Sequence, residues 1–251
     1  MIDEIEINME ENSEACFIIK YISEDGKTKN FHQLKQITNA RENSKVKITI
    51  ANLINDESES FIAVENITAE NANIEHNLID LGGKTKISNY YTKLTGYRST
   101  NILNNLYLGI NRDIIDMNYH VEILGKKSVC NIEAQGAIDG FSKKNFKGTI
   151  DFIEGSANAI GEENENCVIL SDNAKSKSLP MLLCHEENVQ GAHGVSSGKI
   201  DEDKLFYIMS KGISKEEAER LIIKANFNNI IKNIDDEELQ NEIVEIIERS
   251  I

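Results

Sequence analysis

The sequence predicts a mainly β protein that ends in a small α-helical region. From about Ile5 to Ile200, short runs of alternating apolar and polar residues are separated by polar turns. These runs follow one another at intervals of roughly 10 to 14 residues, which leaves no room for the long helical crossovers of βαβ units. After Ile200 the apolar residues recur at helical spacing instead. Together these observations favour a β sandwich, barrel or solenoid with C-terminal helices.

The clearest predicted strand is VKITIAN, residues 46–52, in which Val46, Ile48 and Ile50 share one face. Three later runs are similar in character, namely NYHVEILG, KKSVCNIEAQGAI and KGTIDFIEG. Between Gly96 and Gly155 the runs resemble repeats with asparagine at their corners, a pattern typical of a solenoid whose rungs stack on one another. No fixed period is visible, so the pattern alone leaves the sandwich and the barrel open.

The change of pattern near residue 200 divides the chain into a predicted β domain, residues 1–200, and a predicted helical subdomain, residues 201–251. Asp201 is suited to cap a first helix that ends near Lys211, and Gly212 to the left-handed position after it.

Two further helices are predicted from capping signals and apolar stripes. Ser214 and Glu217 form a capping box, and Asp235 with Glu238 resembles another. The stripes that follow these caps are Ala218, Leu221, Ile222 and Ala225 in the second helix and Leu239, Ile243, Ile246 and Ile247 in the third. We expect the acidic outer face of these helices to be solvated, although the stripes can also hold a partner.

Composition and charge exclude several classes of function. The net charge is −15 and no basic cluster is present, which argues against nucleic acid and anionic membranes as partners. The N-terminal residues lack the basic and apolar segments of a signal peptide, and no run reaches the roughly 18 apolar residues of a membrane helix. We therefore expect a cytoplasmic protein with reduced thiols, and we expect Cys16 and Cys130 to be small buried hydrophobic residues.

The histidines and cysteines supply the candidate metal chemistry. Cys184, His185 and His193 lie within ten residues of one another, with Glu187 between the two histidines. Thiolate and imidazole are ligands for zinc or iron, and sulfur suits iron–sulfur chemistry in particular. The spacing fits no zinc-finger pattern, so a site would have to be assembled across rungs or subunits, and a structural role for His193 stays open.

No enzymatic motif stands beside these ligands. The segment GGKT at residues 82–85 lacks the earlier glycine of a phosphate-binding loop, so we expect no nucleotide site on this chain. HExxH does not occur and no nucleophile–base pair is evident, and we expect a protein that is not an enzyme.

Residues from about 114 to 227 resemble the SufB/SufD family of iron–sulfur cluster assembly proteins. The pieces that carry the resemblance are IIDMNYHVEILGKKS, FKGTIDFIEGSANAIGEENENCVILSDNAKSKSLP and VQGAHGVSSGKIDEDKLFYIMSKGISKEEAERLIIKANF. The most specific piece is AHGVSSGKID followed by LFYIMSKGI, which is similar to the histidine–glycine motif of the family and the helix after it. Residues 1–90 resemble the family only in their β character.

The resemblance implies a right-handed parallel β-helix with a C-terminal helical subdomain. It also implies a scaffold that forms a homodimer, or a heterodimer with a SufB-type protein, through the β-helix and holds a transient iron–sulfur cluster. Through the helical subdomain such a scaffold binds a SufC-type ABC ATPase. The residues that match the family's ATPase-binding helix and turn are Leu205, Phe206, Tyr207, Lys211, Gly212, Ile213 and Leu221, with lysine at position 211 in place of the usual arginine.

The resemblance also assigns roles to individual residues of the cluster region. His193 matches the histidine of the SufD-type motif, and Gly194 stands where SufB-type members have glutamate. The sulfur-accepting cysteine of SufB aligns with Glu165, and Cys167 follows two residues later. The candidate cluster ligands are therefore His193, Cys184, Cys167 and Glu187.

Two other hypotheses remain open at this stage. One is a SufD-like structural partner that binds no cluster. The other is a carbohydrate-binding or carbohydrate-acting β-helix, for which acidic residues would have to line one groove of the solenoid. The second hypothesis leaves the LFYIMSKG helix without a role.

Overall fold

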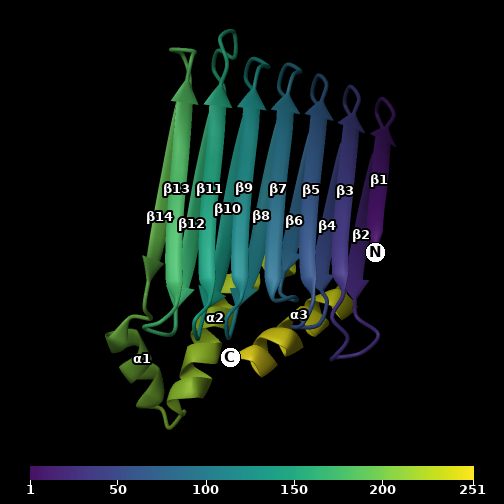
Figure 1. The fold of residues 1–251 in the computed structure, drawn as a ribbon. Helices are drawn as coiled ribbons and strands as arrows, with labels where there is room; N and C mark the ends of the chain where they lie inside the picture. The colour runs from purple at the N-terminus through teal and green to yellow at the C-terminus, as the bar shows by residue number, and fades with distance from the viewer.

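The computed structural model describes residues 1–251 as two seven-stranded sheets followed by three helices (Figure 1). The odd-numbered strands form one sheet, here called the odd sheet: β1 Ile2–Met9, β3 Phe31–Ala40, β5 Glu59–Thr68, β7 Thr85–Leu94, β9 Ile114–Ile123, β11 Lys143–Phe152 and β13 Lys175–Cys184. The even-numbered strands form the even sheet: β2 Glu14–Ile22, β4 Lys45–Leu53, β6 Asn73–Asp80, β8 Thr100–Gly109, β10 Val129–Ile138, β12 Ile160–Ile169 and β14 Gln190–Gly198.

Every strand pairs in parallel with the strand two places later in the chain, so the chain winds as a solenoid. Each turn contributes one strand to each sheet, and the seven strands per sheet make about seven turns. The prediction of a mainly β parallel β-helix with C-terminal helices is confirmed.

The core of the solenoid is built from the residues that alternate onto the inner face of each strand. Val46, Ile48 and Ile50 are 3%, 0% and 0% exposed, which confirms that they share the inner face of β4. Residues in register on neighbouring strands point the same way, so each inner position becomes part of a row of stacked side chains along the solenoid axis.

Asparagines in left-handed conformation form the corners that follow β1, β3 and β5. Asn12, Asn43 and Asn71 have φ angles of 58°, 58° and 51°. Asn43 donates to the Oδ1 atom of Asn12 at 3.2 Å, and Asn71 donates to that of Asn43 at 3.1 Å. These corner asparagines therefore hydrogen-bond to one another from turn to turn. Between Gly96 and Gly155, where the sequence predicted asparagine corners, the corners after β7 and β9 hold Arg98 and Lys127 instead.

Three helices follow the last strand, and each begins at a side-chain cap. They are α1 Glu202–Met209, α2 Lys215–Lys232 and α3 Glu237–Ser250, capped by Asp201, Ser214 and Asp236. The expectation that Asp235 caps the third helix is wrong. Asp236 accepts from the backbone N–H of Leu239 at 2.7 Å, whereas Asp235 lies 2.9 Å from the Lys47 Nζ atom in an ion pair.

Helices α2 and α3 pack against the outer face of the even sheet near the C-terminal ends of its strands (Figure 1). Phe227 and Ile243 pack there against Ile79 and Leu106, and all four side chains are buried. This contact explains why β6 and β8 are apolar on both faces near their ends. None of the three helices is both long and apolar enough to cross a membrane. The division into domains at residue 200 stays a prediction.

Candidate functional site

The last turn of the solenoid, β13 and β14, leaves one end of the molecule open. Each of these two strands pairs with a neighbour on one side only. No residue of β14 is buried. Edge strands of this kind present unpaired backbone N–H and C=O groups to solvent, which are available to a further strand.

His193 lies at this open end. It belongs to β14, and its partner in the parallel register is Glu163 on β12. The inward side of β14 is identified two residues earlier at Gly191, where an added Cβ would lie 3.2 Å from a methyl carbon of Leu182 and 3.3 Å from the Phe152 ring. His193 thus stands on the inner face and is exposed because no further turn covers it.

The other sequence-adjacent candidates do not gather around His193. Cys184 ends β13 and is exposed, and Glu187 is exposed in the turn before β14. His185 instead lies 3.5 Å from Asp151, on the outer side of the odd sheet. No group of three or more histidine, cysteine, aspartate or glutamate side chains is arranged to hold a metal ion. A complete ligand set is therefore not assembled within one copy of the chain.

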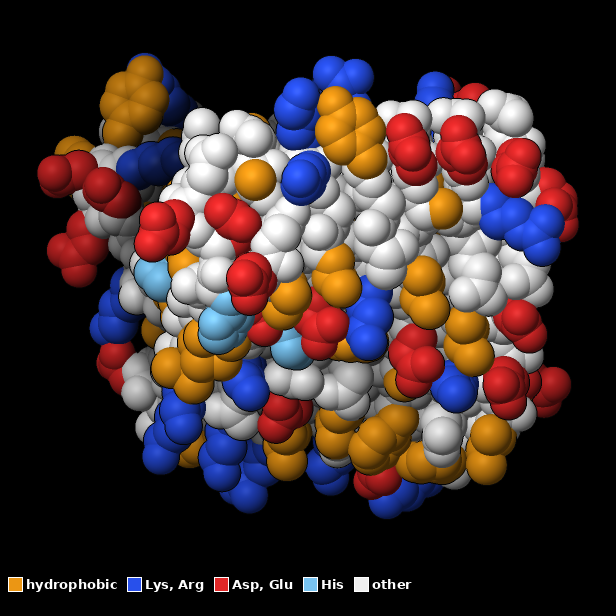
Figure 2. Space-filling view, turned by 90° about the horizontal axis from the view of Figure 1, so that it is seen from above, with side chains coloured by type: hydrophobic (Ala, Val, Ile, Leu, Met, Phe, Trp, Pro, Cys, Tyr) orange, Lys and Arg blue, Asp and Glu red, His pale blue; other side chains and the backbone are white.

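Histidine side chains are nevertheless concentrated toward this end of the molecule. Figure 2, in which the open end again lies on the left, shows them there among hydrophobic and acidic side chains. The histidines that are not buried are His120, His185 and His193.

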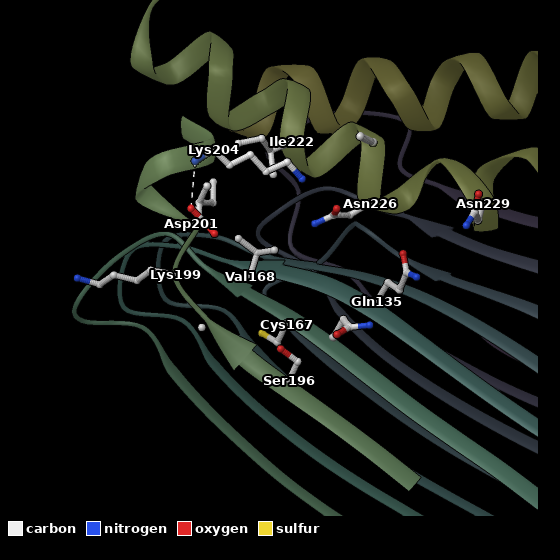
Figure 3. Close-up of a pocket in the computed structure, with 14 residues that line it drawn as sticks. Gln135, Cys167, Val168, Ser196, Lys199, Asp201, Lys204, Ile222, Asn226 and Asn229 are labelled. Carbon is white, nitrogen blue, oxygen red and sulfur yellow. Dashed lines mark hydrogen bonds between the residues drawn. The ribbon is translucent and has the colours of Figure 1, made fainter. Parts of the chain in front are cut away.

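Cys167 lies inside the solenoid rather than on its surface. It is 4% exposed, and burial raises the pKa of its thiol, although Lys144 acts in the opposite direction. It also borders a cavity of about 510 Å³ between the strand ends and the helices. Figure 3 shows this cavity, with Cys167 and Ser196 on the strand side and Lys204 on the side of α1. The environment favours the thiol form of Cys167. Cys130 is buried as predicted, whereas the expectation for Cys16 is wrong because that residue is exposed.

Glu165, the position aligned with the sulfur-accepting cysteine of SufB, is the centre of a buried polar network. Its Oε1 atom accepts from Lys144 at 2.7 Å and from the Tyr107 hydroxyl at 2.5 Å. Its Oε2 atom accepts from Ser178 at 2.9 Å. Sequence reasoning missed this network, yet the alternation of β12 carries a signal, because Glu163, Glu165 and Cys167 all occupy its inner face.

Glu163 is the second inward carboxylate of β12, and it lacks partners. Its side chain is completely buried, and neither carboxylate oxygen has a hydrogen-bond partner. Gly148 makes room for it, since a Cβ added there would lie 1.8 Å from the Oε1 atom. Burial raises the pKa of Glu163 to about 8, and the Glu165 carboxylate adds to the shift. The group is therefore predominantly neutral at pH 7.

The predicted partner-binding residues lie on α1, on the segment after it and, for Leu221, on α2. Phe206 and Tyr207 are 74% and 63% exposed, and α1 contains no buried residue. The Lys211 Nζ atom lies 5.0 Å from the centre of the Tyr207 ring. Gly212 adopts a φ of 90°, which confirms the predicted left-handed residue after the helix. Of the remaining predicted residues, Leu221 is exposed and Leu205 and Ile213 are partly exposed.

Comparison with known proteins places this geometry in a family. Residues 1–226 match the family model described as SUF system FeS cluster assembly, SufBD core domain. The chain belongs to the SufBD family. It is 32% identical over 136 residues to the iron–sulfur cluster assembly protein SufD of Bacillus subtilis, a match that covers 53% of this chain and 31% of SufD.

Two more distant relatives extend the match along most of the chain. Identity to SufD of Escherichia coli is 23% over 240 residues, or 95% of this chain and 56% of SufD. Identity to a SufBD family protein of Pyrococcus horikoshii is 28% over 213 residues, or 84% and 46% of the two chains. The chain thus spans about half the length, or less, of the curated relatives that it matches. Membership of the SufBD family favours the cluster-assembly hypothesis over the carbohydrate hypothesis.

Proposed function

We propose that this SufBD family chain is a non-enzymatic scaffold in a SUF-type iron–sulfur cluster assembly complex. In this proposal it binds a SufC-type ABC ATPase through α1 and the start of α2, and it pairs through the open end of the solenoid with a second copy or with a SufB-type protein. The cluster is its cargo rather than a resident cofactor. The single observation that carries the proposal is the exposed apolar helix α1 within a SufBD fold.

The proposed ATPase-binding surface consists of exposed apolar side chains on helices that are attached to the solenoid. An isolated eight-residue helix with no buried side chain gains little from the rest of its own chain, so its apolar residues are available to a partner. Phe206, Tyr207 and Met209 on α1 and Leu221 on α2 are exposed apolar side chains of this surface. Helix α2 connects the surface to the solenoid, because its other face is buried against the even sheet through Phe227. Movement of a bound ATPase would therefore be transmitted directly to the sheet.

The proposed pairing surface is formed by the free edges of β13 and β14. β13 and β14 each have an unpaired side, and the exposed apolar residues Leu179, Leu183 and Val195 lie on these two strands. A partner strand would satisfy the backbone groups and cover these side chains. Since His193 and Cys184 lie at the same end, pairing would bring the ligands of two chains together and complete a set that one chain lacks.

Among the candidate ligands, His193 and Cys184 are accessible as the chain stands, and Glu187 is exposed close to them. Cys167 would need the end of the solenoid to open before its thiol could receive sulfur or iron, because it is buried. Imidazole and thiolate side chains at the end of the solenoid supply the nitrogen and sulfur ligands that iron–sulfur clusters use.

A second candidate function is a SufD-like structural partner that binds no cluster. The observation that favours it is Glu165, a carboxylate that forms an ion pair with Lys144 at the position of the sulfur-accepting cysteine. In that case the chain would contribute its ATPase surface and its edge strands to a complex whose cluster ligands belong to the other subunit.

The ATPase surface is tested by co-purification of the full chain with a SufC-type ATPase. We expect a Phe206→Ser/Tyr207→Ser variant to lose the ATPase, since it removes the two most exposed aromatic side chains of α1. Phe31→Ser is the matched control, because Phe31 is 45% exposed but lies at the other end of the odd sheet. Retention of the ATPase by the double variant would exclude this surface.

The cluster role is tested separately by iron and sulfide analysis and by absorption spectra after anaerobic reconstitution. We expect the cluster signal to fall in His193→Ala and Cys184→Ser. An unchanged signal in both variants would exclude the ligand assignment and leave the structural-partner function.

A further inference from the structure

A completely buried carboxylate without any partner lies directly beneath the open end of the solenoid. Glu163 contrasts with Glu165 two residues later, whose carboxylate is fully engaged by Lys144, Tyr107 and Ser178. Burying a carboxyl group without hydrogen bonds costs free energy, and packing gains nothing specific from an acidic side chain at such a place. Glu163 is therefore better explained by a ligand that it meets than by its role in the fold.

A ligand-type neighbour of Glu163 lies on the adjacent strand. His193 is the register partner of Glu163, and both residues occupy the inner face of the even sheet. Register partners in a sheet are about 4.8 Å apart, and their side chains extend from the same face. A metal ion with ligand bonds of about 2.0 to 2.2 Å fits between an imidazole and a carboxylate attached at that separation.

The opposite sheet leaves this space open. Gly148 on β11 faces the Glu163 carboxylate, and the register partner of Gly148 in the last turn is Pro180. Neither residue supplies a hydrogen-bond donor from its side chain. His193 itself is exposed, so an ion can approach its imidazole from solvent. The completely buried Glu163 carboxylate becomes a ligand once the side chains that cover it move aside.

We propose that Glu163 and His193 bind one ferrous ion at the open end of the solenoid, with Glu163 as its carboxylate ligand. A mixed imidazole and carboxylate pair suits ferrous iron and other first-row divalent metals better than magnesium, which prefers oxygen ligands alone. Water, sulfide or the paired chain fills the remaining positions. This inference deepens the proposed cluster role, on which it rests, by naming the first iron-binding pair of that site.

The test is anaerobic titration of the full-length protein with Co²⁺, a spectroscopic substitute for Fe²⁺, followed by competition with Fe²⁺. We expect Glu163→Gln to weaken binding at least about 10-fold, because it keeps the shape of the side chain and removes the carboxyl group that releases its proton when it binds the metal. Glu162→Gln is the matched control on the same strand, since Glu162 is exposed on the opposite face. We expect the affinity of the control to stay within about twofold of the wild type.

The coupling of the two ligands gives a second readout. We expect the double variant Glu163→Gln/His193→Ala to bind Co²⁺ as tightly as whichever single variant binds it less tightly, because either substitution already breaks the pair. Binding by Glu163→Gln that equals the wild type would overturn the proposal, whatever the effect of His193→Ala. If the Gln variant fails to fold, as thermal unfolding would show, Glu163→Leu suits the apolar surroundings and carries the same expectation.

Failure of this inference is distinguishable from failure of the proposed function. Co-purification with the ATPase depends on α1, so it should be unaffected by Glu163→Gln. Loss of metal binding with retained ATPase binding supports the pair. Intact metal binding in that variant with a normal reconstituted cluster refutes the pair but leaves the scaffold role standing.

Discussion

The Lys144 Nζ atom lies 2.7 Å from the Glu165 Oε1 atom, and neither side chain has any exposed surface. Removing one member of a buried pair leaves an uncompensated charge in a medium of low dielectric constant. We therefore expect Lys144→Met or Glu165→Gln to lower the free energy of unfolding by about 3 to 5 kcal/mol, as measured by urea denaturation.

The double variant Lys144→Met/Glu165→Leu is the informative comparison. We expect it to be more stable than either single variant, because it removes both charges together. An exposed pair, Lys224 with Glu248 at 2.7 Å, serves as the control, and Lys224→Met should change stability by less than about 1 kcal/mol. Equal losses in the buried and exposed pairs would contradict this account.

His76 should make the stability of the solenoid depend on pH. Burial lowers the pKa of His76 to about 3, and its Nε2 atom lies 2.9 Å from Gln36 Oε1, to which a neutral imidazole donates. The unfolded chain binds a proton near pH 6.5, whereas the folded chain does not until about pH 3. The stabilisation is therefore complete above pH 6.5 and is lost as the pH falls toward 3.

Asparagine does not titrate, so the free energy of unfolding of His76→Asn should fall less than that of the wild type between pH 7 and pH 4. We expect the difference between the two decreases to be about 3 kcal/mol, as measured by urea denaturation. His185→Asn is the control because His185 is exposed. Parallel pH profiles for the wild type and His76→Asn would refute the assignment.

Gly136 should tolerate no side chain. The ring of Tyr107 lies over it, and an added Cβ would approach the ring to 2.1 Å. Only glycine at this position lets the Tyr107 hydroxyl reach Glu165. We expect Gly136→Ala to cost about 1 to 3 kcal/mol in thermal or chemical unfolding. Gly198→Ala, where no atom lies within 4 Å, should be close to neutral, and similar costs for both would refute the steric argument.

Truncation of Phe227 should lower the stability of the protein, whereas truncation of Phe206 should not. Phe227 is 1% exposed and anchors α2 to the even sheet, whereas Phe206 is 74% exposed. We expect Phe227→Ala to cost about 3 to 5 kcal/mol and to reduce the helical signal in circular dichroism on mild heating. Phe206→Ala should leave stability unchanged within about 0.5 kcal/mol. A destabilised Phe206→Ala would mean that α1 is packed in solution.

The local features of the fold were readable from the sequence where one residue type decides them. Alternation placed Val46, Ile48 and Ile50 inside, and Ser214 and Gly212 marked helix ends by capping chemistry. The sequence could not tell which of Asp235 and Asp236 caps α3, because either aspartate can act as a cap. The ion pair between Asp235 and Lys47 decides between them.

The solenoid itself was harder to recognise because its turns differ in length. The corner asparagines Asn12, Asn43 and Asn71 are separated by 31 and then 28 residues, so no fixed period appears. The strand pattern therefore left the sandwich and the barrel open beside the solenoid, and the resemblance of the histidine–glycine motif predicted the β-helix.

The candidate site was predictable in part. His193 and the exposed residues of α1 follow from motifs that are contiguous in the sequence. Glu163 does not, because its isolation depends on Gly148, which lies 15 positions earlier and faces it only after the chain has folded back. Residues of this kind become visible only when the two sheets are placed face to face.

Because neighbouring strands pair in register, each turn adds the same length to the solenoid. Lys45, Asn73 and Thr100 occupy one row, so excision of residues 73–99 would bring Thr100 to the place of Asn73 with all inner faces still aligned. Each turn separates the first strand from His193 by a further 4.8 Å or so. The length of the solenoid can therefore change in whole turns while the register of the remaining strands is kept.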